Sequence, residues 1–286
     1  MRIRGAIAIA VLSSAACSNA APPPAPERAA EVLVINIPRA PVHPRSSPGA
    51  DALLDLDGII ERGAIRVLVA RSGTHFFPRD GGHAGKTVDA GVALAGAISG
   101  RAGKVVQPVF VETHEPDLIP HLLAGKGDVA ANLLLTFARD EQVAFAPPIR
   151  TGIRELIVTH ESAPLRTLED VGTRTIHVRE GSDHHASLVR LNEQLRKSDR
   201  SPARIELTLP PMTDEQLLER VHQGHISATI VDDYVYERQR ASLPHIVANP
   251  DIAVSLDGSL SWVTRKDAPR LIAVLKEFFT THRLTF

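Results

Sequence analysis

The stretch LLAGKGDVAANLLLTFAR, residues 122–139, carries the strongest signal for the fold. It overlaps PDLIPHLLAGK, residues 116–126, in which apolar residues recur at helical spacing. DVAANLLL, residues 128–135, is a short apolar run of the kind found in buried strands. Arg139 follows this run. A helix followed by a buried strand indicates an α/β unit, and an arginine just past the strand faces the edge where open α/β sheets bind ligands.

The same alternation continues on both sides of this stretch. Further strands are expected at residues 64–70, 104–112, 154–160, 175–180, 203–210, 225–232, 245–256 and 259–265. Further helices are expected at residues 53–63, 86–100, 165–172, 181–197, 214–224, 232–241 and 268–283. Residues 71–85 are expected to form a loop. The pattern predicts a layered α/β fold in two halves of similar size.

The composition excludes several classes of protein. The chain has 286 residues, of which 43% are hydrophobic and 23% charged, with a formal net charge of -1. That balance is ordinary for a globular protein and supplies no field that would attract nucleic acid or an anionic membrane, so no nucleic-acid partner is expected. No apolar run is long enough for a transmembrane helix.

Residues 1–17 have the organisation of a bacterial secretion signal. Arg2 and Arg4 precede a short apolar core, and small residues then lead to Cys17, the only cysteine. Cys17 resembles the lipidation site of bacterial lipoproteins, which predicts a periplasmic protein anchored to a membrane through this residue. Ordinary cleavage after Ala20 is the alternative. Residues 18–52 are rich in Pro and Ala and are predicted to be a tether.

The residues that could carry metal or catalytic chemistry do not form a recognisable motif. His184 and His185 follow Asp183, but neighbouring histidines on a helix point in different directions and do not share an ion easily. GGHAGKT, residues 81–87, lacks the spacing of a phosphate-binding loop, and no serine or cysteine nucleophile motif is present. We therefore expect no metal, no cofactor and no enzymatic activity.

Three segments resemble extracellular solute-binding proteins of family 3, the polar amino-acid type. They are residues 122–139, in which L-x-x-G-K-x-D leads to a strand and T-x-x-R; TIHVREGSDHHASL, residues 175–188; and VHQGHISATIVDD, residues 221–233. The resemblance extends over residues 53–283, and its order of elements is also similar to the binding-protein half of membrane-bound lytic murein transglycosylase F. The sequence ends at THRLTF, where the catalytic domain of that enzyme would begin, so the resemblance implies binding without glycan cleavage.

The resemblance implies a type 2 periplasmic binding protein fold. Two α/β lobes, each a sheet flanked by helices, would be joined by a double-crossover hinge, with the ligand held between them. Lobe 1 would comprise residues 53–150 and 245–286, and lobe 2 residues 155–237. We expect the protein to act as a monomer.

Arg139 and Thr136 are the first pair of ligand-binding candidates. The resemblance implies that Arg139 holds the α-carboxylate of a ligand, for which its planar guanidinium is suited, and that Thr136 adds a hydroxyl or backbone donor. The alternative is a surface arginine paired with Asp140 or Glu141.

Asp232 is the candidate for the opposite end of the ligand. It matches the aspartate that pairs with the α-ammonium group, so Arg139 and Asp232 would hold a zwitterion from opposite lobes. Capping of the next helix by Asp232 or Asp233 is the alternative.

The remaining candidates are Gly181, Ser182, Asp183 and Phe77. Gly181 and Ser182 stand at a helix start, where backbone N–H groups attract a carboxylate. Asp183 departs from the hydroxyl residue usual there: it could cap the helix, repel an anionic ligand or select a cationic group. Phe77 could cover the ligand, or Phe76 and Phe77 could pack in the core.

The leading hypothesis is a periplasmic solute-binding lipoprotein that closes on a small zwitterion, an amino acid or a cell-wall peptide fragment, and delivers it to the permease of an ABC transporter. The first alternative is a ligand sensor that controls a cell-wall enzyme. The second is a dehydratase of this fold, with Asp183 or Glu180 as the general acid.

Overall fold

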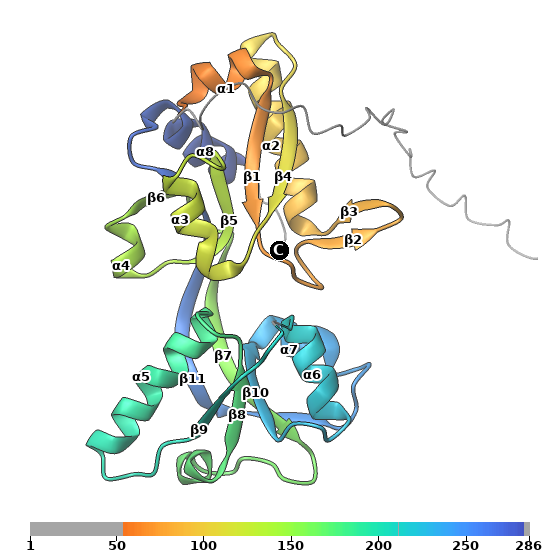
Figure 1. Ribbon diagram of the computed structural model, residues 1–286, viewed down its shortest axis with the longest axis vertical. Helices are drawn as coiled ribbons and strands as arrows, with labels where there is room; N and C mark the ends of the chain where they lie inside the picture. Colours follow the sequence, from red (N-terminus) through yellow and green to blue (C-terminus); the bar gives the residue numbers. More distant parts are fainter. Residues whose placement is uncertain (1–53, 211, 283–286) are drawn as a thin grey trace, which may run out of the picture. The chain divides into compact units, whose positions relative to one another are not determined.

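The computed structural model describes residues 54–210 and 212–282 (Figure 1). The chain separates into a unit of residues 1–48 and a unit of residues 49–286, and all described residues belong to the second. The predicted signal peptide, Cys17, the whole predicted tether, the first residue predicted for the first helix and the last residue predicted for the final helix lie outside the described residues. Within the described part, none of the helices combines the length and apolar character needed to cross a membrane.

The strands form one large sheet and a separate hairpin. They are β1 (Ala64–Val69), β2 (Phe77–Arg79), β3 (Gly82–Ala84), β4 (Gln107–Glu112), β5 (Val129–Leu134), β6 (Val143–Phe145), β7 (Arg150–His160), β8 (Thr175–Val178), β9 (Arg204–Leu207), β10 (Ala228–Asp232) and β11 (Ile246–Arg265). The sheet runs in the order β4-β1-β5-β11-β7-β10-β8-β9, with β6 paired to β11.

Helices cover this sheet. They are α1 (Leu56–Arg62), α2 (Lys86–Ala102), α3 (Leu118–Leu123), α4 (Phe137–Asp140), α5 (Asp183–Lys197), α6 (Asp214–His222), α7 (Asp233–Gln239) and α8 (Pro269–Thr281), with short 3₁₀ turns η1 (Glu115–Asp117) and η2 (Leu168–Thr173). The α/β class predicted from the alternation is therefore confirmed.

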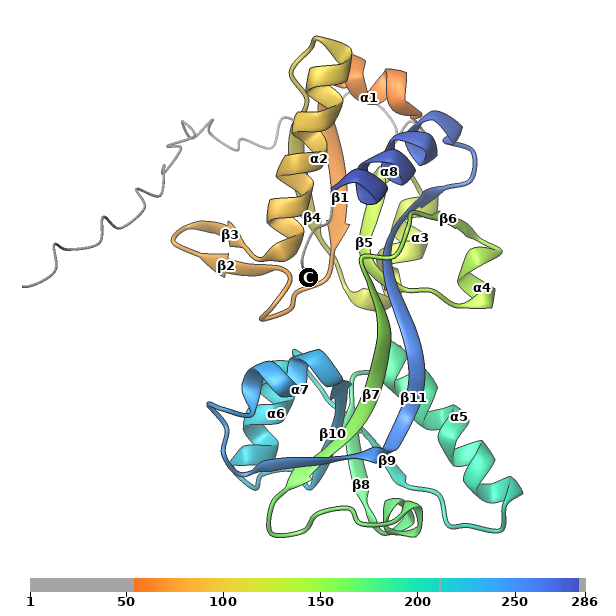
Figure 2. The same cartoon turned by 180° about the vertical axis from the view of Figure 1, so that it is seen from behind.

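Two strands run through both halves of the fold. β7 and β11 pair in antiparallel fashion and lie side by side in both views (Figures 1 and 2). At one end, β11 pairs with β5 and β6; at the other, β7 pairs with β10. We call α1 to β6 with the end of β11 and α8 "lobe 1", and β8 to α7 with the adjoining parts of β7 and β11 "lobe 2".

The structure adds α4 and β6, which the sequence did not predict, and has the 3₁₀ turn η2 where a helix was predicted at residues 165–172. It also differs from the prediction in a loop and in the last strands. The predicted loop at residues 71–85 contains the hairpin β2–β3, whose strands are only three residues long and so leave little periodic signal. The two strands predicted at residues 245–256 and 259–265 are one strand, β11, because its pairing with β7 continues across Asp257 and Gly258 through shifts of register. Asp257 takes a positive φ of 60° within this strand.

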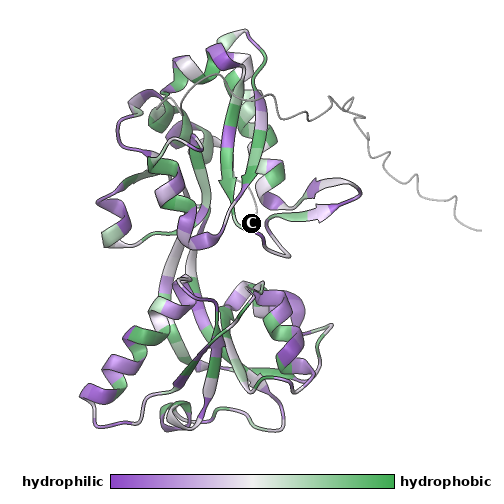
Figure 3. Ribbon diagram, viewed as in Figure 1, coloured by the Kyte–Doolittle hydropathy of each residue, from purple (hydrophilic) through white to green (hydrophobic). Residues whose placement is uncertain are grey.

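Each lobe has its own apolar core. In lobe 1, α2 and α8 pack on the sheet, where Trp262 and Phe76 are almost fully buried. A second group forms under α3, around Leu118 and Leu122. In lobe 2, α5 covers one core and α6 and α7 cover another. In Figure 3, β1 is mainly hydrophobic, whereas α5 and α6 carry many hydrophilic residues.

Local signals in the sequence account for several element ends. Gly63 ends α1 in the left-handed conformation, with φ of 72°, and its N–H donates to the carbonyls of Ile59 and Ile60. At the other end of the fold, Thr213 and Gln216 form a reciprocal capping box that begins α6.

Asp128, the aspartate of the L-x-x-G-K-x-D pattern, is fully buried before β5. Its carboxylate accepts hydrogen bonds from the Arg66 backbone N–H at 2.7 Å, from the Arg66 guanidinium at 3.0 Å and from Arg62. This aspartate therefore ties α1, β1 and the start of β5 together.

Candidate functional site

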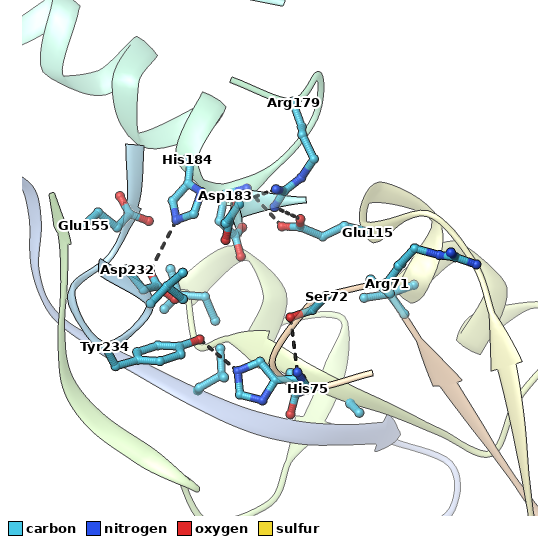
Figure 4. Close-up of a pocket in the computed structure, with 18 residues that line it drawn as sticks. Arg71, Ser72, His75, Glu115, Glu155, Arg179, Asp183, His184, Asp232 and Tyr234 are labelled. Carbon is cyan, nitrogen blue, oxygen red and sulfur yellow. Dashed lines mark hydrogen bonds and ion pairs between the residues drawn. The ribbon is translucent and has the colours of Figure 1, made fainter. Parts of the chain in front are cut away.

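A cavity of about 110 Å³ lies where the two lobes meet (Figure 4). Its polar lining is dominated by charged side chains from both lobes. These are Arg71, Glu115, Glu155, Arg179, Asp183, His184, Asp214 and Asp232, accompanied by Ser72, His75, Asn132 and Tyr234. Five of the charged residues are carboxylic acids, so the cavity has an acidic character.

Arg139 of lobe 1 and Asp183 of lobe 2 form a bidentate ion pair across the lobes. Arg139 Nη2 lies 2.6 Å from Asp183 Oδ1, and Arg139 Nη1 donates to Asp183 Oδ2 at 2.9 Å. The same Nη1 donates to the carbonyl of Leu134 at 3.0 Å. Only 20% of the Arg139 side chain and 24% of the Asp183 side chain are exposed. The guanidinium that the sequence assigns to a ligand carboxylate is therefore engaged by a carboxylate of the chain itself.

Glu115 of lobe 1 and Arg179 of lobe 2 form a second connection. Arg179 Nη2 donates to Glu115 at 3.0 Å, and the other oxygen of Glu115 accepts from the backbone N–H of Asp183 at 3.2 Å. Arg179 also contacts Asp214. Burial works against the charge of Arg179, but Asp214 and Glu115 outweigh it and raise the pKa of this guanidinium far above its ordinary value.

Burial and neighbouring charges shift the pKa values of the two acids in this group in opposite directions. Burial raises the pKa of Asp183, the Glu115 carboxylate raises it further, and Arg139 only partly offsets these effects. For Glu115, burial acts in the same sense, but Arg179 and His184 outweigh it and the pKa is lowered.

His184 lies at the centre of the lobe 2 side of the cavity. Its Nε2 is 3.3 Å from Asp232 Oδ1 and its Nδ1 is 3.8 Å from Asp214 Oδ1. Burial alone would lower the pKa of His184, but Asp214 and Asp232 raise it to about 10. The imidazole is consequently protonated at neutral pH and acts as a fixed cation between carboxylates.

Glu155 is the least satisfied acid of the cavity. Glu155 is only 3% exposed, and its Oε2 has no hydrogen-bond partner among the described residues. Burial raises its pKa. Leaving a buried oxygen without a hydrogen bond costs free energy, and a ligand that donates a hydrogen bond to it removes this cost.

His75 and Tyr234 close the cavity from opposite lobes. His75 Nε2 and the Tyr234 hydroxyl lie 3.0 Å apart, and Arg150 stacks over the Tyr234 ring with its guanidinium carbon 4.4 Å from the centroid. Burial lowers the pKa of His75 to about 4, so this ring is neutral at pH 7. Burial and the neighbouring Asp232 raise the pKa of Tyr234, and its hydroxyl is hydrogen-bonded to Asp232.

Glu215 adds a further contact between the lobes. It accepts hydrogen bonds from the Gly73 backbone N–H at 3.0 Å and from the Thr74 hydroxyl at 2.9 Å. Together with the pairs of Arg139, Glu115 and His75, this contact connects the two lobes.

Of the residues predicted from the sequence, Asp183 and Asp232 line the cavity, and Arg139 reaches it through Asp183. Arg139 is not paired with Asp140 or Glu141, the alternative drawn from the sequence. Asp232 makes no side-chain cap for α7; its carboxylate faces His184 and Tyr234 instead.

The other predicted residues have structural contacts. The Ser182 hydroxyl caps α5 by accepting from His185 N–H, which excludes the helix-capping role considered for Asp183. Thr136 Oγ1 accepts from the backbone N–H of Arg139. Phe77 lies in β2, outside the lining of the cavity.

Position 181 requires glycine for two reasons, its backbone conformation and the lack of space for a side chain. Its φ is 71°, and a Cβ at this position would lie 2.8 Å from the side chain of Pro116 in lobe 1. This turn therefore permits the close approach of the two lobes.

Sequence reasoning missed most of the charged network. Glu115, Arg179, Asp214 and Glu155 come from different elements that no local motif connects. His184 was considered only with His185, yet His185 Nδ1 accepts from Gly181 N–H and only His184 lines the cavity. Tyr234 is the exception, because it follows the predicted strand end and lies two positions after Asp232. That position could have identified it as a candidate.

Glu155, His184 and Asp232 also have the composition of a metal donor set. One potential ligand atom from each lies within 4.8 Å of the others. No metal site was expected from the sequence, because these three residues are far apart along the chain. Any experiment on cationic ligands therefore needs a control for metal binding by these three side chains.

Comparison with known proteins adds family information to this geometry. Residues 65–284 match the family model described as bacterial extracellular solute-binding proteins, family 3. Two curated relatives are named membrane-bound lytic murein transglycosylase F: one from Alcanivorax borkumensis, 28% identical over 242 residues, and one from Maricaulis maris, 30% identical over 208 residues. These alignments cover 84% and 71% of this chain but 47% and 42% of the relatives, so the chain spans less than half of their length.

Solved structures show the same fold at low sequence identity. Holo ArgBP from T. maritima superposes with a TM-score of 0.60 and 21% identity, covering 79% of this chain and 92% of that one. The ancestral amino acid-binding protein AncCDT-1, a precursor of cyclohexadienyl dehydratase, gives a TM-score of 0.61 and 24% identity, covering 79% and 92%. These similarities confirm the predicted type 2 periplasmic binding protein fold.

Proposed function

This chain belongs to the bacterial extracellular solute-binding proteins of family 3, and we propose that it binds a small ligand carrying an ammonium group in the cavity between its lobes. The observation that carries the proposal is the placement of Asp232 and Glu155 on that cavity, the latter with a buried oxygen that has no hydrogen-bond partner among the described residues. An ammonium group offers three donors and a positive charge, which both carboxylates accept.

Closure of the lobes is the proposed output of binding. A ligand that binds only a closed form of the two lobes shifts the population towards that form. A membrane permease that recognises the closed form would receive the ligand, as expected for ABC-type transport. The amino-acid-binding proteins among the solved relatives support a small amino compound as the ligand.

A thermal-melt screen of the full chain tests this function. Amines, amino acids and muropeptides are added singly, and a true ligand is expected to stabilise the protein by about 2.7 kcal/mol at a hundredfold excess over Kd. Asp232→Asn keeps the side-chain shape and removes the charge, so we expect it to abolish the shift. The matched control is Asp251→Asn, which changes an exposed aspartate outside the cavity lining. A ligand whose shift persists in Asp232→Asn would show that this site is not where it binds.

A role as a ligand sensor for a cell-wall enzyme is the second candidate. It is supported by the curated relatives, which are lytic transglycosylases. Co-purification with a permease or with peptidoglycan enzymes distinguishes the two roles.

We propose that the chain acts by binding and not by catalysis. The two general acids considered for a dehydratase are poorly placed: Asp183 is held by Arg139, and Glu180 is exposed and absent from the cavity lining. Turnover of a cyclic carboxylic acid by the purified protein would contradict this.

The location we propose is the periplasm, with a lipid anchor on Cys17. The motivating feature is the single cysteine after a short apolar segment and small residues. Labelling of the expressed protein with a radioactive fatty acid is expected for the wild type and absent in Cys17→Ser. Equal labelling of both would exclude Cys17 as the anchor.

A further inference from the structure

We propose that the ligand is an organic cation that carries an ammonium group and no carboxylate, because Asp183 occupies the guanidinium of Arg139 that would otherwise receive one. This inference rests on the proposed function and narrows its ligand class.

Arg139 is committed to contacts within the chain. Two of its donors form the bidentate pair with Asp183, at 2.6 Å and 2.9 Å, and the carbonyl of Leu134 takes a third contact at 3.0 Å. Planar bidentate pairing uses the fork of the guanidinium that a ligand carboxylate would need. A carboxylate ligand would have to displace Asp183, whose charge would then remain nearby.

The cations that line the cavity are also paired with acids of the chain. Arg179 contacts Glu115 and Asp214. His184 lies beside Asp232 (Figure 4), and its Nδ1 is 3.8 Å from Asp214 Oδ1. Arg71 makes two hydrogen bonds to Glu112, at 2.9 Å and 3.2 Å. The part of the cavity that the structure describes therefore offers a ligand anion no cation without a carboxylate partner.

The acids, in contrast, are in excess. Five carboxylic acids line the cavity, whereas Arg139, Arg179 and His184 are the cations left to balance them once Arg71 is assigned to Glu112. Glu155 contributes the buried oxygen that has no hydrogen-bond partner among the described residues. A cationic donor satisfies this oxygen and reduces the surplus of negative charge, whereas an added carboxylate increases it.

The test compares amines with the amino acids that differ from them by one carboxylate. Agmatine and arginine, putrescine and ornithine, and ethanolamine and serine are titrated into the full chain by calorimetry. We expect at least one amine to bind, and its amino acid to bind at least about 100-fold more weakly, since like charges brought together cost several kcal/mol. If an amino acid binds as tightly as its amine, this inference is wrong while the proposed function stands. If no amine and no amino acid binds, both are wrong.

Substitution of Asp183 tests the cause of the selectivity. Asp183→Ser removes the internal carboxylate and leaves Arg139 available, so we expect the amino acid of the binding pair to gain affinity by more than about tenfold relative to the amine. Asp183→Asn, which keeps the shape, should move the ratio in the same direction. Adding Arg139→Gln to Asp183→Ser should abolish the gain. An unchanged ratio in both single variants would overturn the proposal, and far-UV circular dichroism verifies that each variant is folded.

A divalent metal ion is the other cation that Glu155, His184 and Asp232 could accept. Titrations are therefore repeated in EDTA, and Zn²⁺ is titrated alone. Amine binding that persists in EDTA supports the proposal. Stabilisation by Zn²⁺ together with loss of amine binding in EDTA would assign the site to a metal and overturn it.

Discussion

Replacement of Asp128 by alanine is expected to lower the free energy of unfolding by about 3–5 kcal/mol, the usual result of removing one partner of a buried ion pair. Asp128 is fully buried, and it accepts from Arg62 and from both the backbone and the guanidinium of Arg66. Without its carboxylate, a buried backbone N–H loses its acceptor and two guanidinium groups lose their counter-charge. Urea unfolding of the wild type and the variant at pH 7 measures the difference.

Asp140→Ala is the matched control for this prediction. Asp140 is an exposed aspartate of the same lobe, and its replacement should change stability by no more than about 0.5 kcal/mol. A loss below about 1 kcal/mol for Asp128→Ala would mean that the buried cluster contributes little to the fold. Because Asp128 is not among the residues that line the cavity, ligand binding by the folded variant should be retained.

His184→Gln is expected to destabilise the protein at neutral pH by up to about 4 kcal/mol and to remove a pH dependence that the wild type shows. The reason is the raised pKa: the folded protein holds the His184 proton up to about pH 10, whereas the unfolded chain releases it near 6.5. At pH 7 the folded pKa lies about 3 units above the pH, and each unit corresponds to about 1.4 kcal/mol. The bound proton therefore accounts for the expected loss of about 4 kcal/mol in the free energy of unfolding.

The sign of the pH effect follows from the same shift. A group whose folded pKa is raised contributes its stability in full below the unfolded pKa, here 6.5, and loses it as the pH rises towards about 10. The difference between wild type and His184→Gln should therefore shrink progressively over this range. Urea midpoints measured at intervals between pH 6 and 10 provide the test.

His225→Gln is the control, because His225 is an exposed histidine of the same lobe. It should follow the wild type at every pH. A constant difference between wild type and His184→Gln from pH 6 to 10 would mean that the imidazole contributes by packing and not by charge. Such a result would also weaken the account of the cavity as an acidic site balanced by a fixed imidazolium.

Buried charged groups have different roles in two parts of the molecule. Around Asp128, the charged groups lie within one lobe and stabilise its fold. Around His184, they line the cavity, and several of the pairs they belong to connect the two lobes. Charge pairs of the second kind are also the contacts that a ligand can replace, since a cation entering the cavity competes with Arg139, Arg179 and His184 for the same carboxylates.

The order and type of most elements follow from the sequence because their signals are local. Apolar spacing predicts α8, and five of its residues, Leu271, Val274, Leu275, Phe278 and Phe279, are buried as that spacing requires. Gly63 ends α1 because glycine adopts the left-handed conformation without strain. The family resemblance was also available from the sequence, since it depends on the order of strands, turns and helices, and the match over residues 65–284 confirms it.

The tertiary structure decided which charged groups meet at the cavity. Arg139 and Asp183 are 44 positions apart, in α4 and α5, and no pattern in the sequence indicates that they meet. Their pairing depends on the approach of two lobes linked by β7 and β11, and it converts a predicted carboxylate receptor into an internal ion pair. Local sequence fixes backbone geometry and burial periodicity, whereas the charge that a ligand encounters is a sum over side chains that only the folded chain brings together.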